Sequence, residues 1–524
     1  MSTRPQNPPI ICTDDGWILD TSTPETILRD IEEKVVGAYA GCPAALWWNT
    51  GAPDVYTYET EIGELIGDHP ESADGIVARN LRRLIETAGG PLSALIPLCR
   101  GAGLPFFARL RMNSHYDIEP DDPLWSDVRR QHPDWCIGMP DSGYPVGSLE
   151  HGIRTGFDFR HREVRNYRLA IIGELIERFE LDGLELDFMR HPAFFRIAEA
   201  YQHRHLMTDL MREVRKRVAA AGAARNRPMQ LAVRVPATLA DAARIGLDVT
   251  RWMEEYLVDI VVVGGGFIPY ETPIREFVDM AGDGIDVYGC IESTRYADEK
   301  NLRAIASHFY AGGAHGVQLY NFYTKGAEWN RRILNQLADP QTLVRLDKRY
   351  ELDQTARFTT PYHCAFPVHN IEATFRYASP PAQLPVALES TVCGEGIELT
   401  LEVDDDLQTV PESRLPASLL TLRFAGLSPN ARIDAALNGR PLSWTAARSS
   451  YEGWMRQEIE AEFWKVHPAA TVEVRREGAS VAWLLDRNVL RQGRNRLRVG
   501  IAAGAGEQAV LTGVELLLDY EAGE

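Results

Sequence analysis

Two carboxylates stand two positions apart near the middle of the chain, inside a short apolar stretch. Glu185 and Asp187 alternate with Leu184, Leu186 and Phe188. Side chains of a β-strand alternate between two faces, so both acids share one face and the apolar residues share the other. Apolar segments on either side indicate a covered parallel strand, in which inward carboxylates need charged partners or a catalytic role. An ion-pair network with nearby arginines is the structural alternative to catalysis.

A second strand pattern, at residues 105–113, carries the arginines that could face these acids. Arg109, Arg111 and Asn113 share one face of this predicted strand, and His115 continues the same alternation beyond it. A solvated edge strand would also explain alternating arginines. Two inward arginines opposite two inward carboxylates account better for both stretches, and together they predict a charged site.

Eight alternating strand and helix patterns between residues 9 and 322 would position these side chains. Their helices include residues 161–179 and 239–256. Such an alternation predicts an α/β fold, a (β/α)8 TIM barrel, whose active site lies at the C-terminal ends of the strands. Polar residues gather at those ends: Asp14, Asp15, Trp48, Asn49, Arg111, Asn113, Glu185, Asp187, Arg234, Glu292, Tyr320 and Asn321.

Paired carboxylates at a barrel mouth suit the cleavage of glycosidic bonds, in which one acid protonates the departing oxygen while another attacks or activates water. Asp187 and Glu292, on the fourth and seventh predicted strands, are the predicted catalytic pair. Glu185, one layer deeper, would orient an arginine or raise the pKa of a neighbour. The arginines also allow an anionic sugar such as a uronate. The predicted substrate-binding residues are Asp15, Trp48, Asn49, Arg109, Arg111, Asn113, His115, Arg190, His191, Arg234, Tyr320 and Asn321.

Near residue 370 the alternating strand and helix patterns give way to short strand patterns, separated by turns such as Asn438-Gly439. These short strand patterns predict an all-β sandwich. The expected domains are a barrel at 1–337, a joint at 338–372 and an accessory sandwich at 373–524.

The composition of the chain limits the classes of binding partner that we expect. The net charge of −19 disfavours nucleic acid and anionic membranes, since both require a basic face. Neither an apolar leader nor a run of about 18 apolar residues occurs, so we expect a cytoplasmic protein without membrane attachment. The seven scattered cysteines indicate neither a disulfide framework nor a zinc site. Without a dinucleotide or P-loop motif, no metal or cofactor is expected, and an oligomer remains compatible with the sequence.

The stretch Asp182–Pro192 resembles the fourth-strand signature of the bacterial family 10-like glycosyl hydrolases. Supporting segments are Arg111–Asn113, His132–Trp135, Arg162–Tyr167, Arg234–Pro236 and Asp14–Gly16. The resemblance covers most of residues 9–330 and implies a barrel glycoside hydrolase with Asp187 in the active site. The same stretch is similar to the chitinase motif, but the final catalytic acid of that motif falls on Met189, which puts the chitinase mechanism in doubt. The sandwich resembles accessory modules of carbohydrate enzymes.

Two other functions fit the same residues. One is a carbohydrate-binding protein whose barrel does not catalyse a reaction. The other is a sugar lyase or isomerase, whose products would lack an oxygen atom from solvent.

Overall fold

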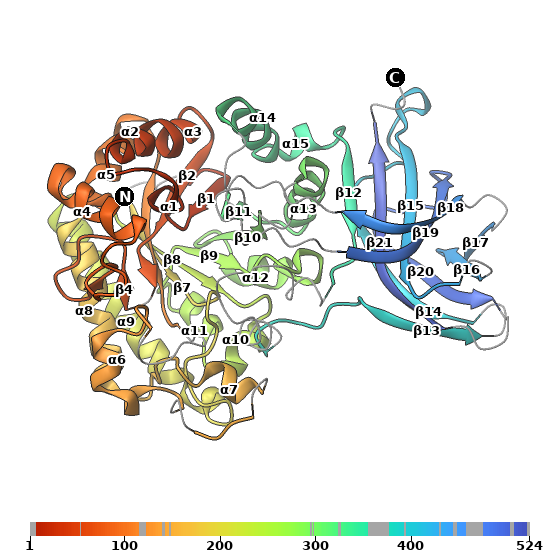
Figure 1. Ribbon diagram of the computed structural model, residues 1–524. Coiled ribbons are helices and arrows are strands. Elements are labelled where there is room, and N and C mark those ends of the chain that lie inside the picture. The colour runs from red at the N-terminus through yellow and green to blue at the C-terminus, as the bar shows by residue number, and fades with distance from the viewer. Residues whose placement is uncertain are drawn as a thin grey trace.

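The computed structural model describes residues 7–52, 54–114, 122–138, 142–145, 148–293, 296, 298–322, 326–354, 377–391, 395–428, 431–443, 448–456, 475–502 and 508–520. A barrel surrounded by helices lies beside a separate set of β-strands from the C-terminal part of the chain (Figure 1). The two bodies meet on the side of the barrel that carries α13 (Glu299–Ala311) and α15 (Pro340–Leu343).

The barrel confirms the predicted fold class. Its eight parallel strands close in the order of the chain, with the last strand pairing to the first. The strands are β1 (Ile10–Asp14), β2 (Ala44–Asn49), β6 (Phe106–Arg111), β7 (Gly183–Asp187), β8 (Gln230–Val235), β9 (Ile260–Val263), β10 (Asp286–Glu292) and β11 (Gly316–Tyr320).

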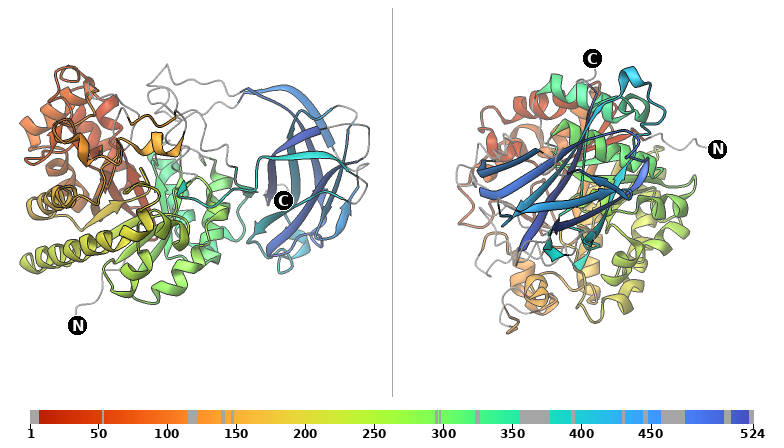
Figure 2. Two further views of the ribbon diagram at one scale, coloured as in Figure 1. Left: turned by 90° about the horizontal axis from the view of Figure 1, so that it is seen from below. Right: turned by 90° about the vertical axis from the view of Figure 1, so that its right-hand side faces the viewer.

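Helices cover the outside of the barrel (Figures 1 and 2). The longer ones are α4 (Ile76–Ala88), α5 (Pro91–Gly101), α8 (Arg162–Arg178), α9 (Ala200–Ala224), α12 (Ile274–Ala281), α13 and α14 (Ala327–Leu337). The shorter ones are α1 (Ile18–Thr21), α2 (Ile27–Asp30), η1 (Ile31–Val36), α3 (Gly37–Tyr39), α6 (Asp127–Gln131), η2 (Pro133–Trp135), α7 (Leu149–Ile153), α10 (Leu239–Arg244), α11 (Val249–Glu254) and η3 (Pro269–Glu271). Within the described residues, no helix is long and apolar enough to cross a membrane.

One helix prediction is confirmed and another is wrong. The helix predicted at 161–179 is α8, whereas the single helix predicted at 239–256 is divided into α10 and α11. The division occurs at Gly246, which adopts a positive φ of 93° and packs so closely on Phe195 that a Cβ would overlap the ring. A left-handed residue cannot continue a right-handed helix, so the chain turns there.

The strands of the barrel separate two kinds of packing. Leu184 and Leu186 point outward into the core beneath the helices, as their alternation predicts. Inside the barrel, the ring of Trp47 stacks on that of Phe107 at 4.7 Å and fills the end opposite the mouth. Gly183 is required beside them because a Cβ there would overlap Phe107. This apolar filling leaves the C-terminal end of the barrel, here called the mouth, to the polar side chains.

The C-terminal strands confirm the predicted sandwich. The strands are β12 (Lys348–Glu351), β13 (Val386–Thr391), β14 (Ile397–Val403), β15 (Ala417–Ala425), β16 (Arg432–Leu437), β17 (Arg440–Leu442), β18 (Arg448–Arg456), β19 (Arg475–Leu485), β20 (Gly493–Ala502) and β21 (Gln508–Asp519), with the short helix η5 (Glu412–Arg414) among them. One layer is organised around β15 and β21 and the other around β20, while β13 pairs with both β20 and β21. Leucine and valine side chains fill the space between the layers. Two of the short strand patterns of this part of the sequence, at 373–377 and 471–475, lie almost entirely outside the described residues.

The segment predicted as a joint contains a strand of the sandwich. β12 pairs antiparallel with β21, and its side chains also reach α13 of the barrel. Asn301 donates to Glu351 at 2.6 Å, and Arg349 forms an ion pair with Asp298 at 2.7 Å. β12 therefore connects the two bodies by pairing with one and hydrogen bonding to the other.

Candidate active site at the mouth of the barrel

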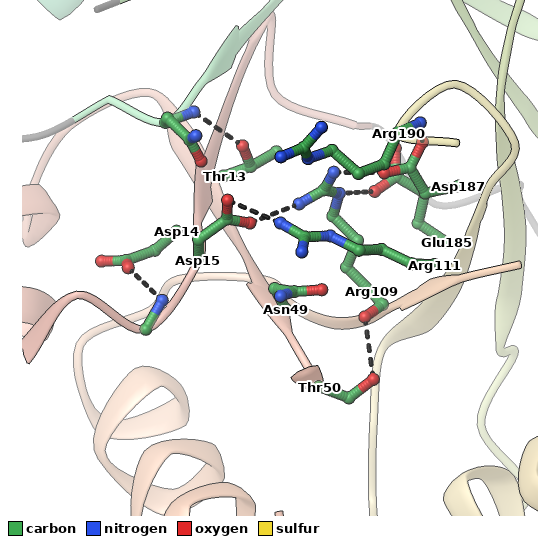
Figure 3. A network of polar contacts seen from close by, with 12 residues as sticks. Thr13, Asp14, Asp15, Asn49, Thr50, Arg109, Arg111, Glu185, Asp187 and Arg190 are labelled. Atoms are coloured by element: carbon green, nitrogen blue, oxygen red, sulfur yellow. Dashed lines mark hydrogen bonds and ion pairs between the residues drawn. The ribbon is translucent and has the colours of Figure 1, made fainter. Parts of the chain in front are cut away.

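A buried arginine of β6 joins three carboxylates at the mouth. Nη1 of Arg109 lies 3.0 Å from Oδ1 of Asp15, Nε lies 2.8 Å from Oε2 of Glu185, and Nη2 donates to Oδ2 of Asp187 (Figure 3). The contact with β7 follows from the sheet register, which places Arg109 beside Glu185 and Arg111 beside Asp187. The inward arginines and inward acids therefore form ion pairs inside the barrel, as the alternation of the two strands predicts. We call Asp15, Arg109, Arg111, Glu185, Asp187 and Arg234 the mouth cluster.

Asp187 is held more tightly than the other acids of the cluster. Arg234 donates from Nε to Oδ1 at 2.8 Å and from Nη2 to Oδ2 at 3.1 Å, in addition to the bond from Arg109. The backbone N–H groups of Met189 and Arg190 donate to Oδ1 at 2.9 and 3.2 Å. Burial by itself would raise the pKa of Asp187, but the charges of Arg234 and Arg109 outweigh it and hold that pKa well below its usual range. Asp187 is therefore ionised at neutral pH.

Glu185 lies one layer deeper and behaves differently. Its Oε1 accepts a hydrogen bond from Gln318 at 2.9 Å, and the side chain is fully buried. Burial, together with the charge of Asp187, raises the pKa of Glu185 from its ordinary value of 4.5 to about 7, although Arg109 acts in the opposite direction. Two neighbouring carboxylates thus differ in protonation: Asp187 keeps its charge, and Glu185 binds a proton near neutral pH.

Asp15 is the most exposed acid of the mouth cluster. Its side chain is 21% exposed, and Nη2 of Arg111 contacts its Oδ2 at 2.7 Å. Burial opposes ionisation, but Arg111, Arg109 and Arg190 together lower the pKa of Asp15. Its neighbour Asp14 turns away from the cluster and accepts the N–H of Gly16 at 2.7 Å (Figure 3). Of the two adjacent aspartates, only Asp15 belongs to the site.

Tyr320 of β11 forms an aromatic wall beside the arginines. The guanidinium groups of Arg109 and Arg234 lie 4.5 and 4.1 Å from the centre of its ring, within range of cation–π attraction. Arg234 also contacts the sulfur of Cys290 at 3.6 Å. These stacked positions fix both guanidinium groups without using all their hydrogen-bonding capacity.

Several neutral polar atoms at this end of the barrel are buried without a hydrogen-bond partner in the described part of the chain. They are Oδ1 of Asn49, Oγ of Ser293, the hydroxyl of Tyr320 and Oδ1 of Asn321. Buried polar atoms of native proteins normally have partners, and those at a binding site commonly find theirs in a ligand. Hydroxyl and amide oxygens of this kind can bond to the hydroxyl groups of a sugar.

Glu292 faces the same interior from β10. It is 2% exposed and lies in register with Tyr320 of the neighbouring strand. Burial, with a smaller contribution from the charge of Glu292, raises the pKa of the Cys290 thiol to about 12. β8 and β9 separate β10 from β7, so Glu292 and Asp187 approach the mouth from different parts of the barrel wall.

Two predicted binding residues do not present their side chains to the site. Trp48 points outward beneath the helices, is 0% exposed, and packs beside Gly16. The prediction for Trp48 is wrong because strand alternation sends Trp47 and Asn49 inward and Trp48 outward. Asn113 lies at the mouth, but its carboxamide bonds to the backbone of Phe157 and Ala193, so it fixes two loops.

The remaining predicted residues lie beyond the ends of the strands. Arg190 lies beside the mouth cluster, facing Asp15 and Arg111 (Figure 3). His191 is buried in the loop after β7. Asn321 has a positive φ of 52°, which asparagine tolerates, and its backbone N–H donates to Thr13 at 3.0 Å. His115 lies outside the described residues.

Three residues of the site are not among those predicted from the sequence: Gln318, Cys290 and Ser293. Gln318 and Cys290 share the inward alternation of Tyr320 and Glu292 on their strands, and that signal could have identified them. Ser293 directly follows Glu292, beyond the strand. Among the described residues, no group of three or more His, Cys, Asp or Glu side chains is arranged to hold a metal ion.

No protein-family model matches the sequence, and no curated protein sequence matches it. Similar solved structures include the GH36 α-galactosidase AgaB from Geobacillus stearothermophilus, which is 12% identical with a TM-score of 0.39 over 94% of this chain and 55% of that one. α-L-Fucosidase isoenzyme 2 from Paenibacillus thiaminolyticus is 10% identical with a TM-score of 0.36, over 65% and 49% of the two chains. A chitinase from Chromobacterium violaceum is 12% identical with a TM-score of 0.33, over 62% and 98%.

All three similar structures are glycoside hydrolases by name. The chain spans about half the length of the α-galactosidase and the fucosidase. Likeness at this level says nothing about the chemistry of this chain, because one fold serves many reactions. The specific resemblance to the family 10-like group stays a prediction.

Proposed function

We propose that this protein is a glycoside hydrolase in which Asp187 acts as the ionised carboxylate and Glu292 as the proton donor. One observation carries the proposal: a carboxylate with a strongly lowered pKa lies at the mouth of a closed barrel, where such folds have their active sites. Glycosidic cleavage passes through a positively charged, oxocarbenium-like transition state, which a fixed negative charge stabilises.

The surroundings of Asp187 define what it must do during the reaction. Both oxygens already accept hydrogen bonds, and Oδ2 is shared by Arg109 and Arg234. Attack on a sugar carbon, or on the proton of a water, requires a lone pair of Oδ2. One arginine must therefore move away as the substrate binds, while Arg234 Nε and the backbone N–H groups hold Oδ1 in place.

The preference for a carbohydrate is supported by the unpartnered neutral atoms around the mouth. Asn49, Ser293, Tyr320 and Asn321 present oxygen atoms that can bond to sugar hydroxyl groups. A site for a purely apolar ligand would leave these atoms buried and unsatisfied.

The proposal is tested by screening the purified protein against aryl glycosides and natural oligosaccharides. Asp187→Asn and Glu292→Gln are compared with the surface variants Asp209→Asn and Glu254→Gln, whose side chains are 64% and 55% exposed. Removal of either catalytic group is expected to lower kcat by about 10²–10⁴-fold, with unchanged circular dichroism. Turnover that survives in Asp187→Asn would remove Asp187 from the mechanism.

A second candidate function is carbohydrate binding without hydrolysis. The observation that favours it is the saturation of Asp187, which accepts from two arginines and two backbone N–H groups and has a side-chain exposure of 0%. Saturable binding of a sugar without product formation in the wild type would support this candidate. Product that carries no oxygen from labelled water would instead indicate a lyase or isomerase.

A further inference from the structure

At the mouth, one carboxylate of the chain bridges two arginines. Oδ1 of Asp15 lies 3.0 Å from Arg109, and Oδ2 lies 2.7 Å from Arg111. Both arginine side chains are more than nine-tenths buried, at 0% and 8% exposure, whereas that of Asp15 is 21% exposed. Planar guanidinium groups that hold the two oxygens of a carboxylate are the arrangement by which arginines recognise carboxylates in ligands.

Asp15 is not needed to hold its own loop. It lies between the end of β1 at Asp14 and the start of α1 at Ile18, and Gly16 follows with a positive φ of 82°. The turn is fixed by Asp14, whose buried carboxylate accepts the N–H of Gly16 at 2.7 Å. The side chain of Asp15 points the other way, toward the arginines (Figure 3). It can therefore rotate away while Asp14 keeps the turn in place.

The neighbouring groups suit the rest of a sugar ring. Asn49 lies in register with Arg109 of the neighbouring strand, is 3% exposed, and its Oδ1 has no partner in the described part of the chain. Tyr320 is 4% exposed, and its hydroxyl likewise has no hydrogen-bond partner in the described part of the chain. A pair of arginines next to unpartnered neutral oxygen atoms matches a molecule that carries both a carboxylate and hydroxyl groups.

We propose that Arg109 and Arg111 recognise the carboxylate of an acidic sugar, a uronic acid unit, and that Asp15 takes its place when the site is empty. The proposal rests on the proposed function in so far as the site accepts carbohydrate. The charge balance explains the selectivity. A uronate replaces one carboxylate by another, whereas a neutral sugar that displaced Asp15 would remove one carboxylate from the buried arginines of the mouth cluster without replacing its charge.

The test is calorimetric measurement of the binding of methyl glucuronoside and methyl galacturonoside. Each is compared with the corresponding neutral methyl glycoside and with the 6-sulfate of that neutral glycoside. The wild type is expected to bind a uronate at least about tenfold more tightly than the neutral sugar. Asp15→Asn should strengthen uronate binding about tenfold, because the competing carboxylate is gone. Arg111→Gln and Arg111→Lys should both weaken uronate binding by a larger factor than they weaken the binding of the neutral sugar, while Arg29→Gln, on a side chain 62% exposed, serves as the surface control.

Each outcome decides between the alternatives. Equal affinity for uronate and neutral sugar, weaker binding of both in Asp15→Asn, or a preference for the sulfate overturns the proposal. Turnover of the matching 4-nitrophenyl glycosides separates it from the proposed function. Hydrolysis of neutral glycosides without uronate preference overturns only this inference. Uronate binding that responds to Asp15→Asn, with no hydrolysis, supports this inference and contradicts the proposed hydrolase.

Discussion

The two ends of the barrel interior are built by the same strands and differ completely in chemistry. At one end, the stacked rings of Trp47 and Phe107 fill the space, and only a glycine fits beside them at position 183. Two residues further along β6 and β7, Arg109 meets Glu185, and the next inward residue of β7 is Asp187. The comparison shows how a barrel can support a costly charged cluster: the apolar end closes the interior, and the mouth concentrates charges that satisfy one another.

Replacement of Arg109, which joins the three carboxylates of the mouth, should have the largest effect on stability. Arg109→Met leaves Asp187, Glu185 and Asp15 each short of a cationic partner in a buried setting. Breaking a buried ion pair from one side typically costs about 3–5 kcal/mol, so we expect a loss of that size in the free energy of unfolding. Urea unfolding at pH 7 measures it. The surface control Arg29→Met should change stability by less than about 0.5 kcal/mol, and an equally small loss for Arg109→Met would show that the cluster is not closely coupled.

The deeper carboxylate should make stability depend on pH. The pKa of Glu185 is raised in the folded protein, from 4.5 to about 7, so Glu185 favours the folded state below about pH 4.5 and loses that contribution as the pH rises through about 7. Glu185→Gln resembles the protonated form and removes this loss. Relative to the wild type, the variant should therefore gain about 3 kcal/mol in unfolding free energy between pH 4 and pH 8, by the conversion of about 1.4 kcal/mol for each pH unit. Parallel pH dependence in the two proteins would show that folding does not raise the pKa of Glu185.

A smaller effect is expected at the apolar end. Gly183→Ala places a methyl group against the ring of Phe107, and overpacking of this kind costs about 1–3 kcal/mol. The double variant with Phe107→Leu should lose less than the sum of the two single variants, because the shorter side chain makes room. Thermal unfolding of the four proteins measures the coupling. Additive losses would mean that the two positions do not contact each other in solution.

Strand alternation explains both the success and the failure of the site prediction. It placed Glu185, Asp187, Arg109 and Arg111 inside the barrel, where the structure has them. A position near the end of a strand predicts that Trp48 lies at the mouth, although its own alternation directs it outward. Alternation along β1 directs Asp14 outward with Ile10 and Cys12, whereas Asp15 lies beyond the strand, where the turn at Gly16 sets its direction.

Local signals also defined part of the sandwich. Asn438 and Gly439 both adopt positive φ angles, 51° and 78°, and join β16 to β17 as their sequence predicts. β12 carried no comparable signal, because its partner β21 lies at the far end of the chain. The pKa values of Glu185 and Asp187 likewise depend on Arg234 and Gln318, which other strands contribute. Spacing in the sequence identifies charged groups on one face, but not how protons are distributed among them.

The central claim, that Asp187 performs hydrolysis at the mouth, is tested most directly by isotope incorporation. A glycoside that the screen identifies as a substrate is incubated in water enriched in oxygen-18 with the wild type or with Asp187→Asn at equal concentration. The mass of the product is measured by mass spectrometry. The account predicts one labelled oxygen per sugar released by the wild type, and a rate at least about 100-fold lower in Asp187→Asn. Unlabelled product, or labelled product formed at the same rate by both proteins, would contradict it.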